Sequence, residues 1–395
     1  MRVAIVIERI ETWRGGAETS TLEFAHLLAG RGTSVTVFTA TRCVSPPDLE
    51  IVMIPVTATP KPLRPARFIA KTTARLRRDP FDIVHAITPM PAADVYQPRG
   101  GLVRETLERN VAMRATAPRR MVKRALAALN VKRRTLLGLE ERALRPGGPV
   151  VAAVSKYVAR QARAHYGLDG ARVRVIFNGV QVAAATEAER AADRAAVRRE
   201  YAVANGTLLI LCVAHNFRLK GVEPLLHGMA RLTRAGGRDV RLLVAGRDNP
   251  VAMAATARRL RIDDLVTFTG PTERIGAFYH AADVVAHATY YDPCSRVVLE
   301  ALSRGVACVT TRLNGAAEAI TDGVEGFVIE TPDDVGELAD RIGRLRDRRM
   351  AAEMGAAAAR LGPRLSMTRH VDEMVELYDE IVARRAKREE LSVNS

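Results

Sequence analysis

Short apolar runs of strand length alternate with longer amphipathic runs along this chain, and the alternation occurs twice. In the first half, the runs that predict strands are 2–8, 34–40, 50–54, 82–86, 149–154 and 173–176, and those that predict helices are 17–28, 66–78 and 155–166. In the second half, the predicted strands are 207–214, 240–246, 265–270, 283–287 and 306–310, and the predicted helices are 221–235, 250–261 and 275–281. Such alternation is typical of parallel sheets covered by helices on both faces. We therefore predict an α/β fold with two doubly wound domains.

The boundary between the domains is expected at the turn sequence Asn178-Gly179-Val180, after which a polar, Ala-rich helix leads into the second set of strands. This predicts an N-terminal domain of residues 1–178, a second domain of residues 179–370, and a C-terminal helix and tail of residues 371–395. A chain of 395 residues with 48% apolar and 26% charged residues has enough apolar side chains for two cores.

The spacing of the cysteines and the N-terminal residues indicate the cellular compartment of the protein. The cysteines are Cys43, Cys212, Cys294 and Cys308. They form no Cys-x-x-Cys pair, which argues against a zinc site and a disulfide framework. The first apolar run meets a charge too early for a signal peptide, and no run approaches the length of a membrane span. We expect a protein of the reducing cytoplasm that is not integral to a membrane.

Positive charge is concentrated in one segment. The chain has a net charge of +16, and residues 99–145 contain eleven Arg and two Lys against four Glu, a net +9. A patch of this kind suits three polyanionic partners: nucleic acid, an anionic bilayer, or a phosphorylated acceptor. No aromatic residues are interleaved for base stacking, so nucleic acid is the least favoured of the three.

Within this segment, residues 121–129 predict a basic amphipathic helix, with Met121, Val122, Ala125, Leu126 and Leu129 on one face. It could be an ordinary helix packed on the core with a solvated charged face. The favoured interpretation is adsorption to anionic lipid, at roughly 1 kcal/mol for each basic residue near the headgroups. The predicted membrane-binding residues are Arg119, Arg120, Lys123, Arg124, Lys132, Arg133 and Arg134.

A loop-to-helix junction at residues 290–305 carries the clearest site signal. Asp292 and Glu300 are eight positions apart, on either side of the point where a Pro-containing turn enters an apolar helical stretch. The first turn of a helix presents unpaired N–H groups and a partial positive charge, which suit a diphosphate, while the carboxylates suit sugar hydroxyls. The spacing fits a nucleotide-sugar, although Asp-Pro is also an ordinary turn signal.

A second loop, residues 215–221, carries Arg218 and Lys220 between a strand and a helix. Because it and the Asp292 loop both follow strands of one parallel sheet, both should open on the carboxyl edge of that sheet. The two cations could neutralise a leaving diphosphate. No Asp-x-Asp occurs in the chain, so we expect no metal and no other cofactor.

In the N-terminal domain, Gly15-Gly16 precedes a helix and permits close approach of a phosphate. The stretch after residue 86 is expected to be a loop at the carboxyl end of a strand, where open α/β sheets bind ligands. Either His85 or Asp94 is predicted to face the reaction centre there. A His that ends a strand is more often structural, so Asp94 is slightly preferred.

Five motifs together resemble the retaining glycosyltransferases of family 4, over nearly the whole chain. They are Gly15-Gly16, Asn178-Gly179-Val180, Arg218 with Lys220-Gly221, the segment from Asp292 to Glu300, and Asn314-Gly315 through Glu318. Within that family, Met-Pro-Ala-Ala-Asp-Val-Tyr and Ala-Gly-Arg-Asp-Asn-Pro are similar to stretches of lipopolysaccharide core glucosyltransferases. The resemblance implies the GT-B fold, in which two Rossmann-like domains face each other across a cleft and a C-terminal helix returns to the N-terminal domain.

The resemblance also implies roles for individual residues. Glu300 should bind the ribose hydroxyls, Asp292 with the amides of Cys294 to Arg296 the transferred sugar, and Arg218 with Lys220 the diphosphate. The catalytic set is Asp292, Arg218, Lys220 and Asp94. The substrate-binding set is Gly15, Gly16, His85, Asp292, Pro293, Cys294, Ser295, Arg296 and Glu300. A basic N-domain surface should anchor the protein peripherally on the inner face of the cell membrane.

Three positions depart from the family pattern: Asp292 replaces a longer Glu, Ser295 replaces a usual Gly, and Leu219 separates Arg218 from the Lys. The expected activity is metal-independent transfer of a hexose from a nucleoside-diphosphate sugar, with UDP-glucose preferred. The expected acceptor is a membrane-associated glycan or glycolipid such as lipopolysaccharide core. The alternatives are a sugar-nucleotide epimerase of GT-B fold and, less favoured, a basic nucleic-acid-binding protein.

Overall fold

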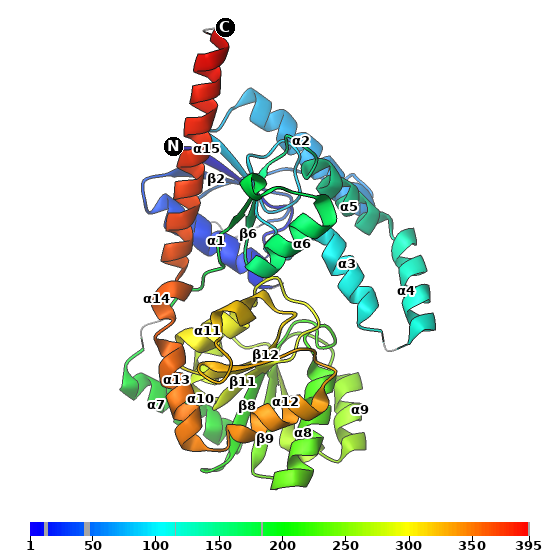
Figure 1. Cartoon of the computed structure of the whole chain (residues 1–395), viewed down its shortest axis with the longest axis vertical. Helices are drawn as coiled ribbons and strands as arrows, with labels where there is room; N and C mark the ends of the chain where they lie inside the picture. Colours follow the sequence, from blue (N-terminus) through cyan, green and yellow to red (C-terminus); the bar gives the residue numbers. More distant parts are fainter. Residues whose placement is uncertain (12–14, 43–47, 115, 183–184, 394–395) are drawn as a thin grey trace. The chain divides into compact units, whose positions relative to one another are not determined.

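The computed structural model describes residues 1–395 apart from 12–14, 43–47, 115, 183–184 and 394–395. The chain forms two compact units, one of residues 1–179 with 367–395 and one of residues 180–366 (Figure 1). The final helix, which we expected from residue 371, begins at Met367. It starts there because Ser366 is extended, with φ −68° and ψ 144°, and ends the preceding short helix.

Unit 1 contains a seven-stranded parallel sheet with the strand order β3-β2-β1-β4-β5-β6-β7. Its strands are β1 Arg2–Val6, β2 Ser34–Thr39, β3 Glu50–Met53, β4 Ile83–Ala86, β5 Val95–Tyr96, β6 Val150–Ala153 and β7 Val173–Val175. Strand β1 lies between β2 and β4, and its residue Val3 pairs with Val35 on β2 and with Ile83 on β4. The order reverses between β1 and β4, so these two strands form the switch point of the sheet.

Helices cover both faces of this sheet. They are α1 Gly16–Ala29, η2 Lys61–Leu63, α2 Arg64–Arg78, α3 Val103–Ala112, α4 Ala117–Leu129, α5 Val131–Ala143, α6 Lys156–Tyr166, η3 Gly170–Arg172 and α15 Met367–Val393. Successive residues of a strand point to opposite faces. Ile5 accordingly packs in a core with Phe24 of α1 and Tyr378 of α15, and Val6 packs in another with Phe68 of α2. The C-terminal helix therefore belongs to the N-terminal unit, as predicted.

Unit 2 contains a six-stranded parallel sheet with the order β10-β9-β8-β11-β12-β13. Its strands are β8 Leu208–Val213, β9 Val240–Ala245, β10 Val266–Gly270, β11 Val284–His287, β12 Ala307–Thr311 and β13 Gly326–Ile329. Its helices are α7 Glu187–Glu200, α8 Val222–Gly236, α9 Val251–Leu260, η4 Asp263–Leu265, α10 Ile275–Ala281, α11 Arg296–Ser303, η5 Gly315–Ala319, α12 Val335–Arg344, α13 Arg348–Ala359 and α14 Gly362–Leu365. The strand order reverses between β8 and β11.

The predicted fold class, two doubly wound α/β domains, is confirmed. Two strands were not predicted. Strand β5 has only two residues, too few to show a period, and β13 begins with Gly326, whose φ of +158° and close approach to Cys308 leave no room for a side chain. Strand β5 lies between β4 and β6 and β13 adds an edge strand, and neither changes a switch point.

Candidate active site

The loops that follow β8 and β11 meet at the switch point of the unit 2 sheet. The backbone N–H of Tyr290 and the hydroxyl of Thr289 both donate to the carbonyl of Leu219, at 2.9 and 3.0 Å. Gly221 ends the first loop with a φ of +71°, and a Cβ there would lie 1.7 Å from the carbonyl oxygen of Ala288. Only glycine lets the two loops come this close, so Gly221 sets the position of its neighbour Lys220.

Lys220 and Asp292 form an ion pair across these two loops. The Lys220 Nζ lies 2.5 Å from Asp292 Oδ2, and the side chains are 21% and 11% exposed. Burial alone would raise the pKa of Asp292, but the Lys220 ammonium and the His287 ring hold it well below its usual range. The two loops therefore share the carboxyl edge of the sheet, as the sequence predicted, and the structure adds that Lys220 pairs there with Asp292 as a carboxylate.

Asp292 has further partners on its buried side. Its Oδ1 accepts from the backbone N–H of Cys294 at 3.2 Å, and its Oδ2 lies 3.5 Å from His287 Nε2. The backbone N–H of Ser295 donates to Asn314 Oδ1 at 3.1 Å. The amides of Cys294 and Ser295, expected to face the sugar, are therefore internal donors in this structure that fix the shape of the turn.

Glu300 lies one turn into α11 and is also restrained. Its carboxylate accepts from the Tyr279 hydroxyl at 3.0 Å and from the Arg296 guanidinium at 3.1 Å. Burial, with the carboxylate beside it, raises the pKa of Tyr279 well above its usual range, so the phenol stays a donor. Arg296, predicted to bind substrate, holds the Glu300 side chain through this i,i+4 pair.

Arg218 is exposed on the same loop as Lys220. Asp248, which was not among the predicted site residues, orients that loop: its Oδ2 accepts from the backbone N–H of Phe217 at 2.7 Å. The sequence could have indicated this role, because Asp248 follows β9 at the carboxyl edge of the same sheet. A short acidic side chain there can accept a hydrogen bond from the backbone of a neighbouring loop.

The predicted site residues of unit 1 lie in different parts of that unit. Gly15 immediately precedes α1 with an extended backbone, φ 169°, that any residue adopts, so its conformation does not require glycine. His85 is fully buried, and its Nδ1 lies 2.6 Å from the Tyr378 hydroxyl of α15. Burial, followed by the charge of Arg99, lowers the pKa of His85 well below its usual value. The expectation that His85 faces a reaction centre is wrong, because α15 covers it.

The predicted position of Asp94 is also wrong. The chain turns back before it, so Asp94 precedes β5 and lies at the amino end of the sheet rather than at the carboxyl edge. Its carboxylate accepts from the backbone N–H of Val84 at 2.8 Å and pairs with Arg385 of α15. Asp94 therefore fastens α15 to the sheet, away from the loops that follow β1 and β4.

Helix α4 carries the predicted membrane-binding residues Arg119, Arg120, Lys123 and Arg124, while the other three lie on α5. Its apolar side chains are uncovered: Met121 is 72% exposed, Val122 59%, Leu126 59% and Leu129 75%. A helix packed on the core would bury these residues, so that interpretation is wrong. No helix among the described residues has the length and hydropathy needed to cross a membrane.

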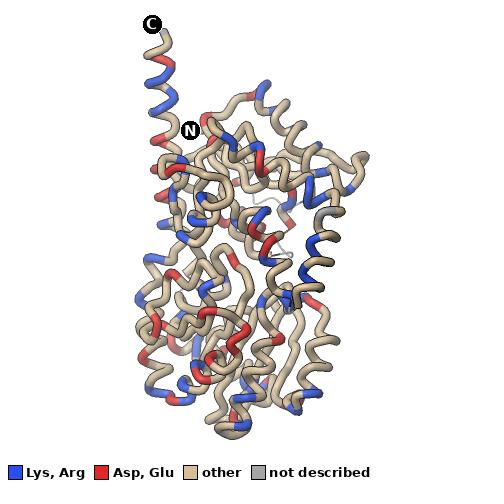
Figure 2. Tube along the Cα trace, turned by 45° about the vertical axis from the view of Figure 1, so that its right-hand side comes forward, with Lys and Arg blue, Asp and Glu red and all other residues tan. Residues whose placement is uncertain are grey.

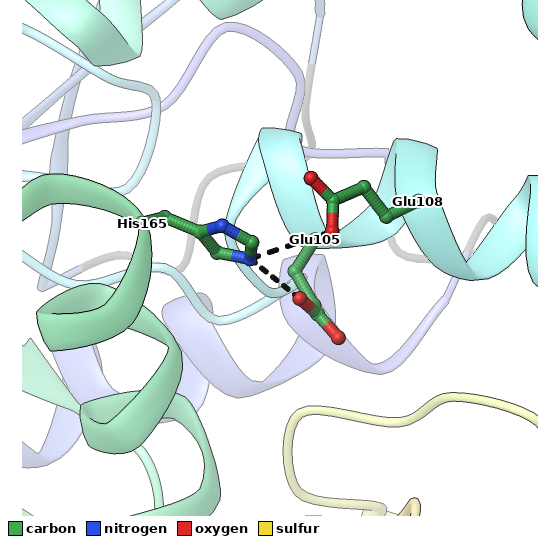
Figure 3. A group of neighbouring side chains, drawn as sticks. All are labelled: Glu105, Glu108 and His165. Atoms are coloured by element: carbon green, nitrogen blue, oxygen red, sulfur yellow. Dashed lines mark hydrogen bonds and ion pairs between the residues drawn. The ribbon is translucent and has the colours of Figure 1, made fainter.

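Buried carboxylates hold together the helices α3, α5 and α6, and α4 lies next to α3 and α5. Glu140 of α5 accepts from the backbone N–H groups of Val103 and Arg104, which begin α3, at 2.8 and 3.1 Å. His165 of α6 lies 2.6 Å from Glu105 of α3 and 4.0 Å from Glu108, which lies one turn further along α3 (Figure 3). These contacts fix α3, and α4 packs against α3 and α5.

Glu105, Glu108 and His165 are also the one group with the spacing of metal ligands that we find in the described part of the chain. Glu105 already accepts from Arg109 at 2.6 Å through its other oxygen, and Arg104 lies 3.7 Å from Glu108. Two guanidinium groups beside the cluster oppose a further cation. We assign it a structural role.

Most of the chain's excess positive charge lies in two segments of unit 1. Residues 56–78, which include α2, contain seven Lys or Arg and no acid, and residues 99–145 add a net +9. Together these segments equal the net +16 of the whole chain, so the remainder is neutral overall. Helix α2 packs against α5, which joins the two segments, and Figure 2 shows the basic positions along the helices of this region.

Two family models match the chain, one for each unit. The model described as Glycosyltransferase Family 4 matches residues 14–184, and the one described as Glycosyl transferases group 1 matches residues 207–348. A D-inositol 3-phosphate glycosyltransferase of Geodermatophilus obscurus is 30% identical over 396 residues, covering 92% of this chain and 84% of the relative. The lipopolysaccharide glucosyltransferase WaaG of Escherichia coli (strain K12) is 25% identical over 321 residues, covering 80% and 82%.

Solved structures agree on the fold. The crystal structure of WaaG, a glycosyltransferase involved in lipopolysaccharide biosynthesis, matches with a TM-score of 0.80 at 21% identity, covering 95% of this chain and 99% of that one. Anabaena HepE in complex with UDP-glucose matches with a TM-score of 0.72 at 19% identity, covering 96% and 100%. The sequence and structure comparisons together show that the chain belongs to glycosyltransferase family 4 and is a glycosyltransferase of the GT-B fold.

Proposed function

We propose that this enzyme transfers a hexose, with retention of configuration, from a UDP-sugar, UDP-glucose first, to a membrane-associated glycan or glycolipid such as lipopolysaccharide core. The observation that carries the proposal is the Lys220–Asp292 pair, where the loops after β8 and β11 meet at the switch point of unit 2. Ligands of open α/β sheets bind at such points. The solved HepE complexes with UDP and with UDP-glucose support a uridine donor.

The predicted site residues of unit 2 each have a chemical task in this proposal. When the bond between the sugar and the diphosphate breaks, negative charge grows on the leaving phosphate oxygen, and Lys220 and Arg218 stabilise it. Glu300 accepts from the ribose hydroxyls, and Asp292 with the turn from Pro293 to Arg296 lies against the sugar. These cations do the work often given to a metal, so the proposed reaction needs none.

Helix α4 supports an acceptor in a membrane. Its exposed Met121, Leu126 and Leu129 would enter the interface between headgroups and acyl chains while the adjoining Arg and Lys meet anionic headgroups. This would hold the enzyme peripherally on the inner face of the cell membrane. Nucleic acid has no part in the proposal, because it would leave the exposed apolar residues and the unit 2 site unused.

A second acceptor class is suggested by the relatives, several of which are D-inositol 3-phosphate glycosyltransferases. A small phosphorylated acceptor would suit the basic unit 1 but would not need the apolar side of α4. The alternative function, a sugar-nucleotide epimerase of GT-B fold, would likewise not need the apolar side of α4. The membrane acceptor is therefore the first candidate.

A transfer assay separates these possibilities. Purified enzyme is given UDP-glucose, UDP-galactose or GDP-mannose, with lipopolysaccharide core glycolipid in vesicles or with inositol 3-phosphate, and product is followed by mass spectrometry. We expect transfer from UDP-glucose to the glycolipid, unchanged by EDTA and lost in Glu300→Gln. Transfer to inositol 3-phosphate alone would assign the soluble acceptor, and epimerised donor without transfer would assign the epimerase. Loss of activity with EDTA and its return with Mg²⁺ or Mn²⁺ would contradict the metal-free mechanism.

A further inference from the structure

His287, the last residue of β11, is the group of the unit 2 site for which neither the motifs nor the proposed function supplies a task. It is 1% exposed. Its Nε2 lies 3.3 Å from Ser295 Oγ and 3.5 Å from Asp292 Oδ2, so one hydrogen on this nitrogen would lie between two oxygen acceptors. Its Nδ1 is buried and has no hydrogen-bond partner in the structure.

The surroundings of the two nitrogens select one form of the ring. A hydrogen on Nδ1 would be a buried donor without an acceptor, which costs about 1–3 kcal/mol. It would also leave the Nε2 lone pair facing the carboxylate of Asp292. A hydrogen on Nε2 is instead donated toward Asp292 and Ser295, which removes the repulsion at that nitrogen, whereas Nδ1 has no partner in either form. Burial, with Lys220 nearby, favours the neutral ring.

The position of His287 explains how the shorter acid works. Asp292 lacks one methylene relative to Glu, so less of its carboxylate reaches outward from the turn. In the structure the carboxylate is held from three sides, by the Cys294 amide, the Nε2 of His287 and the ammonium of Lys220. Of these three, only Lys220 is also partly exposed to solvent and can meet a ligand.

We propose that His287 is a positioning residue, a neutral Nε2–H imidazole that anchors Asp292 from the buried side so that Asp292 orients the Lys220 ammonium toward the departing diphosphate. This inference rests on the proposed function for the role of Lys220. His287 does not touch the substrate and exchanges no proton in the reaction. Because it adds no charge, the negative charge of Asp292 remains available to the ammonium.

The test uses three substitutions that separate hydrogen bonding from packing. His287→Gln places an N–H at the same number of bonds from Cβ as Nε2, His287→Asn places one only as far as Nδ1, and His287→Leu fills the space without a donor. With UDP-glucose and the acceptor found above, we expect kcat to fall roughly tenfold to a hundredfold in Leu and Asn, as for a lost hydrogen bond to a charged group. We expect Gln to recover most of it, with KM for the donor nearly unchanged in all three.

His280→Leu is the matched control. Its imidazole is also largely buried in unit 2 and bonded to a carboxylate, with Nδ1 2.8 Å from Asp193, but it lies on α10 outside the site. It should leave kcat unchanged. Wild-type kcat in His287→Leu, or a folded His287→Gln no better than His287→Leu, would overturn the inference.

A second measurement does not depend on the donor and needs at most one folded variant. Nitrogen-15 correlation spectra of the imidazoles of the wild-type protein, with His287 assigned by its loss in any folded variant or by selective labelling, report which nitrogen carries the hydrogen. We expect a neutral Nε2–H ring at pH 7. An imidazolium or an Nδ1–H ring would reject the inference even if transfer occurs. Absence of transfer from UDP-glucose in the wild type would instead reject the proposed donor and leave the spectrum to decide on His287.

Discussion

The Nζ of Lys220 lies 2.5 Å from the Oδ2 of Asp292, and the two residues come from loops that follow different strands, β8 and β11. An ammonium has three N–H donors, so one can be held by Asp292 while others meet a ligand. The pair thus links Lys220, the cation that stabilises the diphosphate in the proposed mechanism, to Asp292, the acid beside the sugar. A change in either residue should affect both stability and turnover.

The first prediction contrasts the two cations of the 215–221 loop. Lys220→Met leaves Asp292 as a buried carboxylate without its cation, so we expect the free energy of unfolding to fall by about 3–5 kcal/mol along with turnover. Arg218→Ala alters an exposed side chain, so stability should change by less than about 0.5 kcal/mol while turnover falls more than donor binding. Urea unfolding and steady-state kinetics measure both. An Arg218→Ala enzyme with wild-type kcat would remove Arg218 from the mechanism.

The second prediction concerns pH. The pKa of Asp292 is lower in the folded protein than in the unfolded chain, so its contribution to stability is complete above the ordinary carboxyl pKa of about 4 and is lost as pH falls below it. The stability difference between wild type and Asp292→Asn should therefore shrink between pH 6 and pH 3.

The matched control for this titration is Asp264→Asn. Asp264 pairs with Arg238 at the surface, with its side chain 63% exposed, and the pKa of its carboxyl is lowered by that Arg238 hydrogen bond. Solvent screening should make its pH-dependent contribution the smaller of the two. A difference between wild type and Asp292→Asn that stays constant from pH 6 to pH 3 would contradict the paired carboxylate.

The third prediction concerns the contact that brings the two loops together. Gly221→Ala adds a Cβ that would lie 1.7 Å from the Ala288 carbonyl oxygen, at a φ of +71°. Gly206→Ala places the same methyl at a φ of +93° with no atom within 4 Å, so it carries the backbone strain without the collision. We expect thermal unfolding of Gly221→Ala at a clearly lower temperature than Gly206→Ala. Equal melting temperatures would show that the loops separate freely.

The fourth prediction separates membrane binding from the donor site. Reversing Arg119, Arg120, Lys123 and Arg124 to Glu should abolish sedimentation with anionic vesicles. Screening acts over about 10 Å at 0.1 M salt, so hydrolysis of UDP-glucose in solution should change little, and wild-type binding should weaken as salt is added. Replacing Met121, Leu126 and Leu129 by Ser should also weaken binding, because their exposed apolar area would no longer enter the interface.

The control for that experiment reverses four exposed arginines of unit 2, Arg258, Arg259, Arg360 and Arg364, which changes the net charge by the same amount. This variant should sediment with vesicles like the wild type. Equal loss in both variants would mean that net charge, and not α4, drives adsorption. Wild-type protein that ignores anionic vesicles at low salt would indicate a soluble acceptor.

The sequence predicted most of the strands and the common edge of the Lys220 and Asp292 loops, because these follow from the alternation of apolar runs and from the geometry of parallel strands. It could not place Asp94, since a two-residue strand after it has no detectable period and decides at which edge the residue lies. His85 and His287 both end a strand, and only the tertiary partners, Tyr378 and Asp292, distinguish a core residue from one beside the site.

For helix α4, too, the sequence predicted only part of the structure. Its 3.6-residue period predicted which side is apolar, but not whether that side is covered. Helix α4 packs against α3 and α5, and α3 is held by Glu140 and His165, which are distant in the sequence. Burial keeps the pKa of Glu140 raised, yet its four donors retain it as the cap of α3.

The most direct test of the account is a crystal structure with UDP or with a non-hydrolysable UDP-glucose analogue. We expect a diphosphate oxygen at hydrogen-bond distance, about 3 Å, from Lys220 Nζ, and the ribose hydroxyls at a similar distance from the carboxylate of Glu300. Asp292 should keep its contacts to His287 and Lys220 in that complex. A nucleotide bound elsewhere in unit 2, or one whose diphosphate contacts neither Lys220 nor Arg218, would contradict the central claim.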